Sequence, residues 1–212
     1  QQRREVIQGY ITTISAMDAG IGRLLDRLDT LGIADNTLVF FTSDNGYNLG
    51  HHGVNGKGNG THPLNMFEES VKVPFIARCT GRFPAGVVNE DLLSHYDFLP
   101  TILEAAEITP PEDYVMDGRS FLPQLKGDKG NPREWMFFHF EPMSANPAGI
   151  HPNVRFIRDN RWKIYDDGRM YDLNSDPEEE SVCDAGAESQ ECADARARLE
   201  PIFAQMVPGT LP

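Results

Sequence analysis

Apolar residues recur every three or four positions along the first thirty residues and then give way to a continuous run. The recurring positions are Val6, Ile7, Tyr10, Ile14, Met17, Ile21, Leu24, Leu25, Leu28 and Leu31. This spacing places apolar side chains on one face, so it predicts an amphipathic helix that stops at Gly32. Residues 37–42, Thr-Leu-Val-Phe-Phe-Thr, follow a short turn. They predict a central parallel strand that is covered on both faces, so the pattern indicates an α/β layer.

Residues 43–62 lose all apolar periodicity. The segment is rich in glycine and contains three histidines, so we expect a long loop at the carboxyl end of the strand. Ligands bind at that edge of open α/β sheets, and a long polar loop there favours a functional role. A further strand over 71–77 and a helix that begins at Asp97 are expected next, and residues 109–152 are rich in Pro and Gly and predict irregular structure.

The last sixty residues have a different pattern. Residues 153–158, 161–165 and 169–173 alternate between apolar and polar positions, and turn sequences separate the three runs. This arrangement predicts an antiparallel meander. An acidic stretch follows, and then a helix over 191–206 with Ala195, Leu199, Ile202 and Phe203 facing inward. We therefore expect two units, an α/β part over 1–150 and a small α+β subdomain over 151–212.

Composition and charge narrow the classes of partner. The 212 residues include 32 acidic and 19 basic side chains, which gives a net charge of −13. With no basic run longer than Arg3–Arg4, the sequence argues against binding of nucleic acid. No stretch approaches 18 consecutive apolar residues, so no membrane span is expected. Cys183 and Cys192 lie close enough in sequence for one disulfide, which would leave Cys79 over.

Two adjacent oxygen donors follow the first predicted strand. Asp44 and Asn45 lie in a Gly-flanked turn, and a carboxylate beside an amide carbonyl suits a hard cation such as Ca²⁺ or Mg²⁺. The alternative is an Asx-type turn, in which both side chains hydrogen-bond to nearby backbone N–H groups. Local chemistry leaves both interpretations open.

A lysine lies thirteen residues after Asp44. Lys57 is flanked by Gly56 and Gly58, so its point charge sits on a backbone that can approach a ligand closely. This suits an oxyanion such as sulfate or phosphate. The alternative is a solvated loop lysine, which the residue taken alone favours, and the nearby Asp44 and Asn45 reduce that preference.

An ordered set of motifs covers nearly the whole chain: residues 41–46 (FTSDNG), 50–53 (GHHG), 56–58 (GKG), 67–74 (FEESVKVP), 94–103, 117–122, 159–163 and 171–177. Taken together, these motifs resemble the sulfatase family, within the alkaline-phosphatase-like superfamily. The resemblance implies an α/β fold. It would comprise the end of a mostly parallel alkaline-phosphatase-like sheet with flanking helices, followed by the small antiparallel α+β subdomain.

The resemblance also implies roles for individual residues. Asp44 and Asn45 would be two ligands of a divalent ion, usually calcium, and Lys57 would contact the sulfate oxygens as the catalytic cation. His52 matches a family position near the substrate, and His62 lies in a variable loop as a candidate for the substrate pocket. The implied substrate is a sulfated small molecule or glycan. The family also suggests a periplasmic, secreted or lysosomal location.

One family motif is absent from these 212 residues. Sulfatases carry a Cys/Ser-x-Pro-x-Arg motif whose first residue becomes the formylglycine nucleophile, and no segment matches it. The chain therefore resembles the carboxyl-terminal half of a sulfatase, and we expect it to be inactive without an N-terminal half. Two alternatives stay open. One is a phosphomonoester, phosphodiester or phosphonate hydrolase of the same superfamily, and the other is a non-catalytic fragment that binds anions or glycans.

Overall fold

A computed structural model of the protein describes residues 2–58, 64–141, 153–183 and 189–206. The chain begins with α1 (Gln2–Thr30), a single helix of 29 residues. It stops where Gly32 takes a φ of 66° and its N–H donates to the Asp29 carbonyl at 3.0 Å. Only glycine adopts that left-handed conformation without strain, so the predicted helix and its glycine stop are both confirmed.

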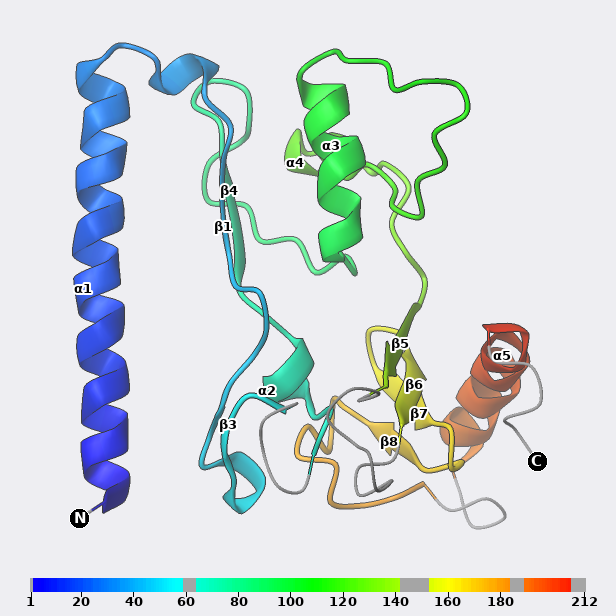
Figure 1. Ribbon diagram of the computed structural model, residues 1–212. Coiled ribbons are helices and arrows are strands. Elements are labelled where there is room, and N and C mark those ends of the chain that lie inside the picture. Colours follow the sequence, from blue (N-terminus) through cyan, green and yellow to red (C-terminus); the bar gives the residue numbers. More distant parts are fainter. Residues whose placement is uncertain (1, 59–63, 142–152, 184–188, 207–212) are drawn as a thin grey trace.

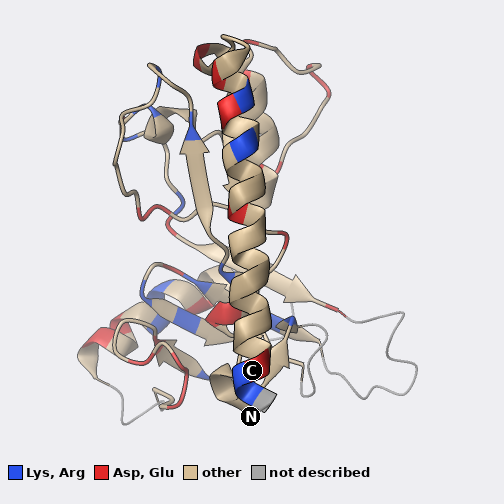
Figure 2. Cartoon of the chain, turned by 90° about the vertical axis from the view of Figure 1, so that its left-hand side faces the viewer, with Lys and Arg blue, Asp and Glu red and all other residues tan. Residues whose placement is uncertain are grey.

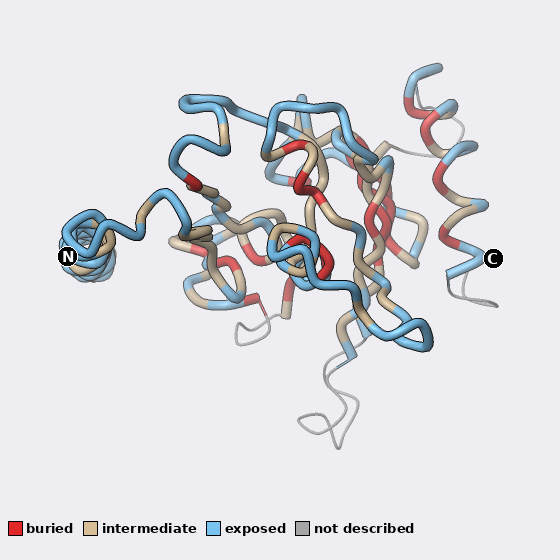
Figure 3. The backbone as a smooth tube through the Cα atoms, turned by 90° about the horizontal axis from the view of Figure 1, so that it is seen from above, coloured by how far each residue is buried: buried red, intermediate tan, exposed pale blue. Residues whose placement is uncertain are grey.

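α1 stands beside the rest of the chain, and most of its surface is exposed (Figures 1 and 3). Ile11 is 57% exposed and Leu24 is 59% exposed, although both are apolar. Contacts with the rest of the chain lie in both halves of the helix. The Tyr10 ring stacks on Tyr47 with centroids 5.8 Å apart, and Asp29 forms an exposed ion pair with Arg78.

The first strand forms a two-stranded sheet. β1 (Val39–Thr42) follows the short 3₁₀ helix η1 (Ala34–Asn36) and pairs antiparallel with β4 (Phe75–Arg78), Val39 opposite Arg78. β1 is half-buried along its length. The expectation of a parallel strand covered on both faces is therefore corrected for this chain, because the partner that β1 finds among the described residues runs in the opposite direction.

Helices pack on one side of this sheet through aromatic rings. η4 (His95–Asp97) leads into α3 (Phe98–Ala105), and α4 (Leu122–Leu125) follows later in the chain. Phe40 of β1 lies 5.3 Å from Phe75, 5.5 Å from Phe98 and 6.0 Å from Phe121, measured between ring centroids. These contacts fix the sheet against both helices.

A small hairpin and a short helix lie between β1 and β4. The hairpin comprises β2 (Asn48–Leu49), η2 (His51–Gly53) and β3 (Asn55–Gly56), with Asn48 opposite Gly56. α2 (Glu68–Val71) follows. The predicted long loop therefore contains short regular elements, which determine where its polar side chains lie.

The C-terminal part is a four-stranded antiparallel sheet in the order β5-β6-β7-β8. β6 (Val154–Arg158), β7 (Trp162–Tyr165) and β8 (Met170–Asp172) are the predicted meander, which is confirmed. β5 (Met136–Phe140) was not predicted. It adds an edge strand, so the sheet begins upstream of residue 151, where we expected the second unit to start.

Both faces of the C-terminal sheet are covered. α5 (Gln190–Met206) packs on one face with Ala195, Leu199 and Phe203 buried and Ile202 partly buried, as the sequence predicted. Phe156, Tyr165 and Tyr171 on the other face pack against Met66 and Val71, beside and within α2. All three cysteines are free, so Cys183 and Cys192 form no disulfide.

Candidate functional site

The turn that contains Asp44 and Asn45 lies at the carboxyl end of β1. Asp44 is exposed and Asn45 is half-buried. The turn is held by its backbone: the Ser43 hydroxyl donates to the Asn45 carbonyl at 2.8 Å, and His95 Nε2 lies 2.9 Å from the Ser43 carbonyl. Within the described part of the chain, neither the Asp44 carboxylate nor the Asn45 amide bonds to a backbone N–H. The Asx-turn alternative is therefore not what these residues form.

Gly46 fixes the position of this turn. Its N–H donates to the Ser70 carbonyl at 3.0 Å, and a Cβ at residue 46 would lie 2.0 Å from the Glu69 carbonyl oxygen. Backbone approaches backbone here, so only glycine fits. The turn of Asp44 and Asn45 is thus packed directly against α2.

The β2–β3 hairpin explains the thirteen-residue spacing between Asp44 and Lys57. β2 leaves the turn and β3 returns antiparallel to it, so Lys57, which follows β3, comes back to the point where β2 began. Gly58 then packs against the same part of α2. A Cβ at residue 58 would lie 2.6 Å from the Ser70 Cβ and 2.4 Å from the Asn65 carbonyl oxygen.

Ser70 therefore contacts the backbone beside the Asp44–Asn45 turn and the backbone beside Lys57. Gly46, two residues after Asp44, and Gly58, directly after Lys57, both pack against Ser70. Lys57 itself is exposed, and no ion pair with another described residue takes up its ammonium. The backbone two residues after Asp44 and the backbone directly after Lys57 therefore meet at Ser70.

The remaining two predicted residues differ in what can be said of them. His62 lies outside the described residues. His52 has a φ of 54° and stacks face to face on Phe67, with ring centroids 3.6 Å apart. Its Nε2 lies 3.2 Å from Glu69 Oε2 and 3.6 Å from Glu178 Oε2. The His52 ring nitrogen therefore faces two carboxylates. A role for His52 in substrate binding stays a prediction.

Two sets of residues have the chemistry to hold a cation. His52, Glu69 and Glu178 offer ligand atoms that all lie within 4.8 Å of one another, although the histidine and carboxylates also satisfy one another as ion pairs. Asp44 and Asn45 offer two hard oxygens that no described side chain occupies. The second pair fits Ca²⁺ or Mg²⁺ better, because these ions take oxygen ligands and keep room for further ones.

Sequence reasoning missed the polar residues that support the site. Asn48, Asn65 and Ser70 are all buried, and they form one hydrogen-bonded chain. Ser70 Oγ lies 2.5 Å from Asn65 Oδ1, and Asn48 Nδ2 donates to Ser70 Oγ at 2.7 Å. Single polar residues in an irregular segment carry no periodicity, so the adjacent glycines were the only available signal.

Comparison with known proteins shows the family. The profile of the family Sulfatase matches residues 1–108, and that of the family N-sulphoglucosamine sulphohydrolase, C-terminal, matches residues 62–204. This chain belongs to the sulfatase family. The family that the sequence motifs predicted is therefore confirmed. Membership in this family implies a metal ion.

Two curated relatives show how much of a sulfatase the chain spans. It is 31% identical over 183 residues to N-acetylglucosamine-6-O-sulfatase from Bacteroides thetaiotaomicron, which covers 83% of this chain and 31% of that protein. It is 33% identical over 162 residues to human N-acetylgalactosamine-6-sulfatase, covering 75% of this chain and 31% of the relative. The chain thus spans about a third of the length of the curated relatives it matches.

Solved structures confirm the expected fold class. A structure described as a complex with its substrate D-glucosamine-2-N,6-O-disulfate superposes with a TM-score of 0.76 at 28% identity, over 92% of this chain and 40% of that one. The phosphonate monoester hydrolase of Agrobacterium radiobacter gives a TM-score of 0.75 at 28% identity, over 93% and 40%. Within the described residues, no helix combines the length and apolar character that a membrane crossing needs.

Proposed function

We propose that this chain is the carboxyl-terminal part of a hydrolase that cleaves sulfate monoesters of a small molecule or glycan. Asp44 and Asn45 provide two ligands of a calcium ion, and Lys57 binds the sulfate oxygens. A bound cation would neutralise negative charge on the sulfate group. The observation that supports the proposal is the packing of Gly46 and Gly58 against Ser70, because these glycines lie next to Asn45 and Lys57 in the chain.

Lys57 would act by charge. An exposed ammonium on a Gly-flanked backbone can contact an ester oxygen, and its positive charge would stabilise negative charge that develops on the departing group. Asp44 and Asn45 would orient the sulfate through the metal ion. Substrate names among the relatives and the disulfated glucosamine complex support a sulfated sugar as the substrate class.

The nucleophile would come from residues outside this chain. We propose that it is a formylglycine in an N-terminal portion of a sulfatase, which covers α1 and the free edge of β1. Residues 6–17 of α1 contain no charged side chain (Figure 2). Ile14 is nevertheless 42% exposed and Met17 is 46% exposed. A charge-free, exposed helical face fits an apolar protein surface. About two thirds of the length of each curated relative lies outside the match, which is enough sequence to provide such a cover.

Turnover by the full-length natural protein tests the proposed chemistry. We expect an aryl sulfate to be hydrolysed faster than the matching aryl phosphate. Lys57→Ala should lower kcat by about 10²–10³-fold, the usual cost of losing one electrostatic contact to the transition state. Lys129→Ala, at an exposed lysine elsewhere, is the matched control and should leave kcat unchanged. Equal loss in both variants, or no loss in Lys57→Ala, would refute the role of Lys57.

Calcium titration tests the metal ligands separately. In isothermal titration calorimetry, Asp44→Ala should bind calcium more weakly than the parent protein binds it, because one carboxylate ligand is lost. Equal affinity would remove Asp44 from the site.

Charge insertion tests the proposed cover of α1. Ile14→Asp would bury a charge under the cover, whereas Thr12→Asp lies about 200° round the helix from it. We expect only Ile14→Asp to reduce the yield of folded full-length protein. If both variants fold equally well, the proposed cover is wrong.

A second candidate function has one observation in its favour. The fold matches the phosphonate monoester hydrolase as closely as the disulfated glucosamine complex, with TM-scores of 0.75 and 0.76. The same turnover assay decides between the two: faster cleavage of the aryl phosphate or of a phosphonate monoester would favour the second candidate. Binding of sulfated glycan with no turnover by the full-length protein would favour a non-catalytic role.

A further inference from the structure

We infer that Lys163 is a positioning residue. It ties residues 65–70 to the C-terminal sheet and, through them, fixes both the turn of Asp44 and Asn45 and the backbone that carries Lys57. The roles of those three residues rest on the proposed function, but the positioning itself is a property of this chain.

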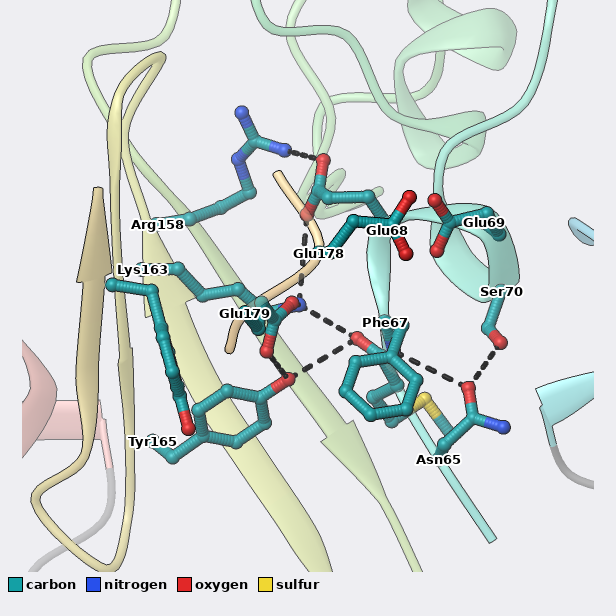
Figure 4. Close-up of polar contacts among 12 residues, drawn as sticks. Asn65, Phe67, Glu68, Glu69, Ser70, Arg158, Lys163, Tyr165, Glu178 and Glu179 are labelled. Carbon is teal, nitrogen blue, oxygen red and sulfur yellow. Dashed lines mark hydrogen bonds and ion pairs between the residues drawn. The ribbon is translucent and has the colours of Figure 1, made fainter. Parts of the chain in front are cut away.

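Lys163 is a fully buried cation at the centre of several contacts (Figure 4). It lies on β7 with 0% exposure, and its Nζ donates to the Met66 carbonyl at 2.7 Å and to Glu179 Oε1 at 2.6 Å. The ammonium also lies 4.3 Å from the ring centroid of Phe156 and 5.0 Å from that of Tyr165. Burial lowers the pKa of Lys163, and the Glu179 carboxylate offsets part of that effect.

Glu179 is held equally firmly. The Tyr165 hydroxyl donates to Glu179 Oε2 at 2.6 Å, and both residues are buried. Burial raises the pKa of the Tyr165 phenol, so the hydroxyl keeps the proton that it donates. A buried ion pair adds little net stability compared with well-packed apolar side chains. Its directional hydrogen bonds are therefore better explained by the geometry they impose than by the stability they add.

The Met66 carbonyl depends on Lys163. Nζ is its near donor at 2.7 Å, whereas the Tyr165 hydroxyl lies 3.5 Å away. Glu68 lies two residues after Met66 and forms an ion pair with Arg158. Lys163 Nζ also lies 3.5 Å from the Glu68 carboxylate. The C-terminal sheet thus binds residues 66–68 through the Met66 carbonyl and through the Glu68 side chain.

Residues 65–70 pass this position on to the candidate site. The Asn65 N–H donates to the Gly58 carbonyl at 3.1 Å, next to Lys57, and the Ser70 carbonyl accepts from Gly46 at 3.0 Å. Asn48 Nδ2 links the hairpin to the same segment through Ser70 Oγ at 2.7 Å. A shift of residues 65–70 would therefore move the turn of Asp44 and Asn45 and the backbone that carries Lys57.

Hydrogen exchange of the full-length natural protein tests the inference without relying on activity. The key variant is the double change Lys163→Met with Glu179→Gln, which removes both buried charges and leaves no lone carboxylate. Ile164→Val is the matched control on the same strand, because Ile164 packs on the opposite face among the residues against α5. We expect the Asn65 amide to exchange about fivefold faster in the double variant, as loss of one hydrogen bond predicts, and to be unchanged in the control.

A kinetic measurement then separates positioning from general destabilisation. For a sulfate ester, the double variant should lose at least about tenfold in kcat, because a small misplacement of charged groups weakens transition-state contacts, while KM changes less. Asn65 exchange at the wild-type rate in the double variant, or equal acceleration in Ile164→Val, would overturn the inference. If exchange changes as expected but the parent protein cleaves no sulfate ester, the positioning stands and the proposed function fails.

Discussion

Gly46→Ala is the sharpest test of how the candidate site is assembled. The added Cβ would lie 2.0 Å from the Glu69 carbonyl oxygen and 2.8 Å from the Ser70 carbonyl carbon. Cβ contacts shorter than 3.0 Å are essentially never seen, so the turn must move by about 1 Å from α2. Such overpacking costs about 1–3 kcal/mol, and loss of the Gly46 N–H bond to Ser70 adds about 0.5–1.5 kcal/mol.

Denaturant unfolding and turnover measure this effect in the full-length protein. We expect the free energy of unfolding to fall by about 1.5–4.5 kcal/mol and kcat/KM to fall by about 10²-fold. Gly53→Ala is the control, because that site has nothing within 4 Å but a φ of 75°. It should cost about 1–2 kcal/mol from backbone strain alone. If Gly46→Ala is no more harmful than Gly53→Ala, close packing of the turn on α2 is not what positions Asp44.

Three further changes test the supporting structure. Asp97→Asn should lower the free energy of unfolding by about 3–5 kcal/mol in urea, because the half-buried Arg133 loses its buried, charged partner; a loss below about 1 kcal/mol would contradict this. Phe203→Ala should cost about 3–5 kcal/mol in the same assay, because the side chain is 0% exposed, and a smaller loss would mean that α5 packs loosely. Arg161 lowers the pKa of Asp172 through hydrogen bonds, so this carboxylate stabilises the fold above its unfolded pKa of about 3.9. That stability is lost as pH falls through the lower folded pKa, so Asp172→Asn should flatten the acid limb of a stability–pH curve; an unchanged limb would contradict it.

The sequence predicted elements whose pattern is local and failed where the partner is remote. α1, the meander and α5 follow from apolar spacing and turn residues alone, and all three are confirmed. β1 looked like a central parallel strand because its residues are continuously apolar, but apolar content does not reveal strand direction. β5 was missed because Pro- and Gly-rich sequence surrounds it and its neighbour β6 begins fourteen residues later.

The candidate site shows the same division between local and remote information. Chemistry that a residue carries by itself was visible in the sequence: hard oxygens at Asp44 and Asn45, and a cation between glycines at Lys57. The glycines indicated a close approach of the backbone to a neighbour, but the sequence could not show that Gly46 and Gly58 both pack against Ser70.

Lys163 was invisible as a positioning residue for a physical reason. An alternating strand that contains a lysine predicts a solvent-facing position, and β7 instead has all four residues buried because α2 and α5 cover opposite faces of the sheet. A lysine at such a position must find acceptors or lose its charge, and it finds the Met66 carbonyl and Glu179. A buried cation that is satisfied across about a hundred residues of sequence therefore identifies the contact between the two parts of this chain, which is where the turn and loop of the candidate site are anchored.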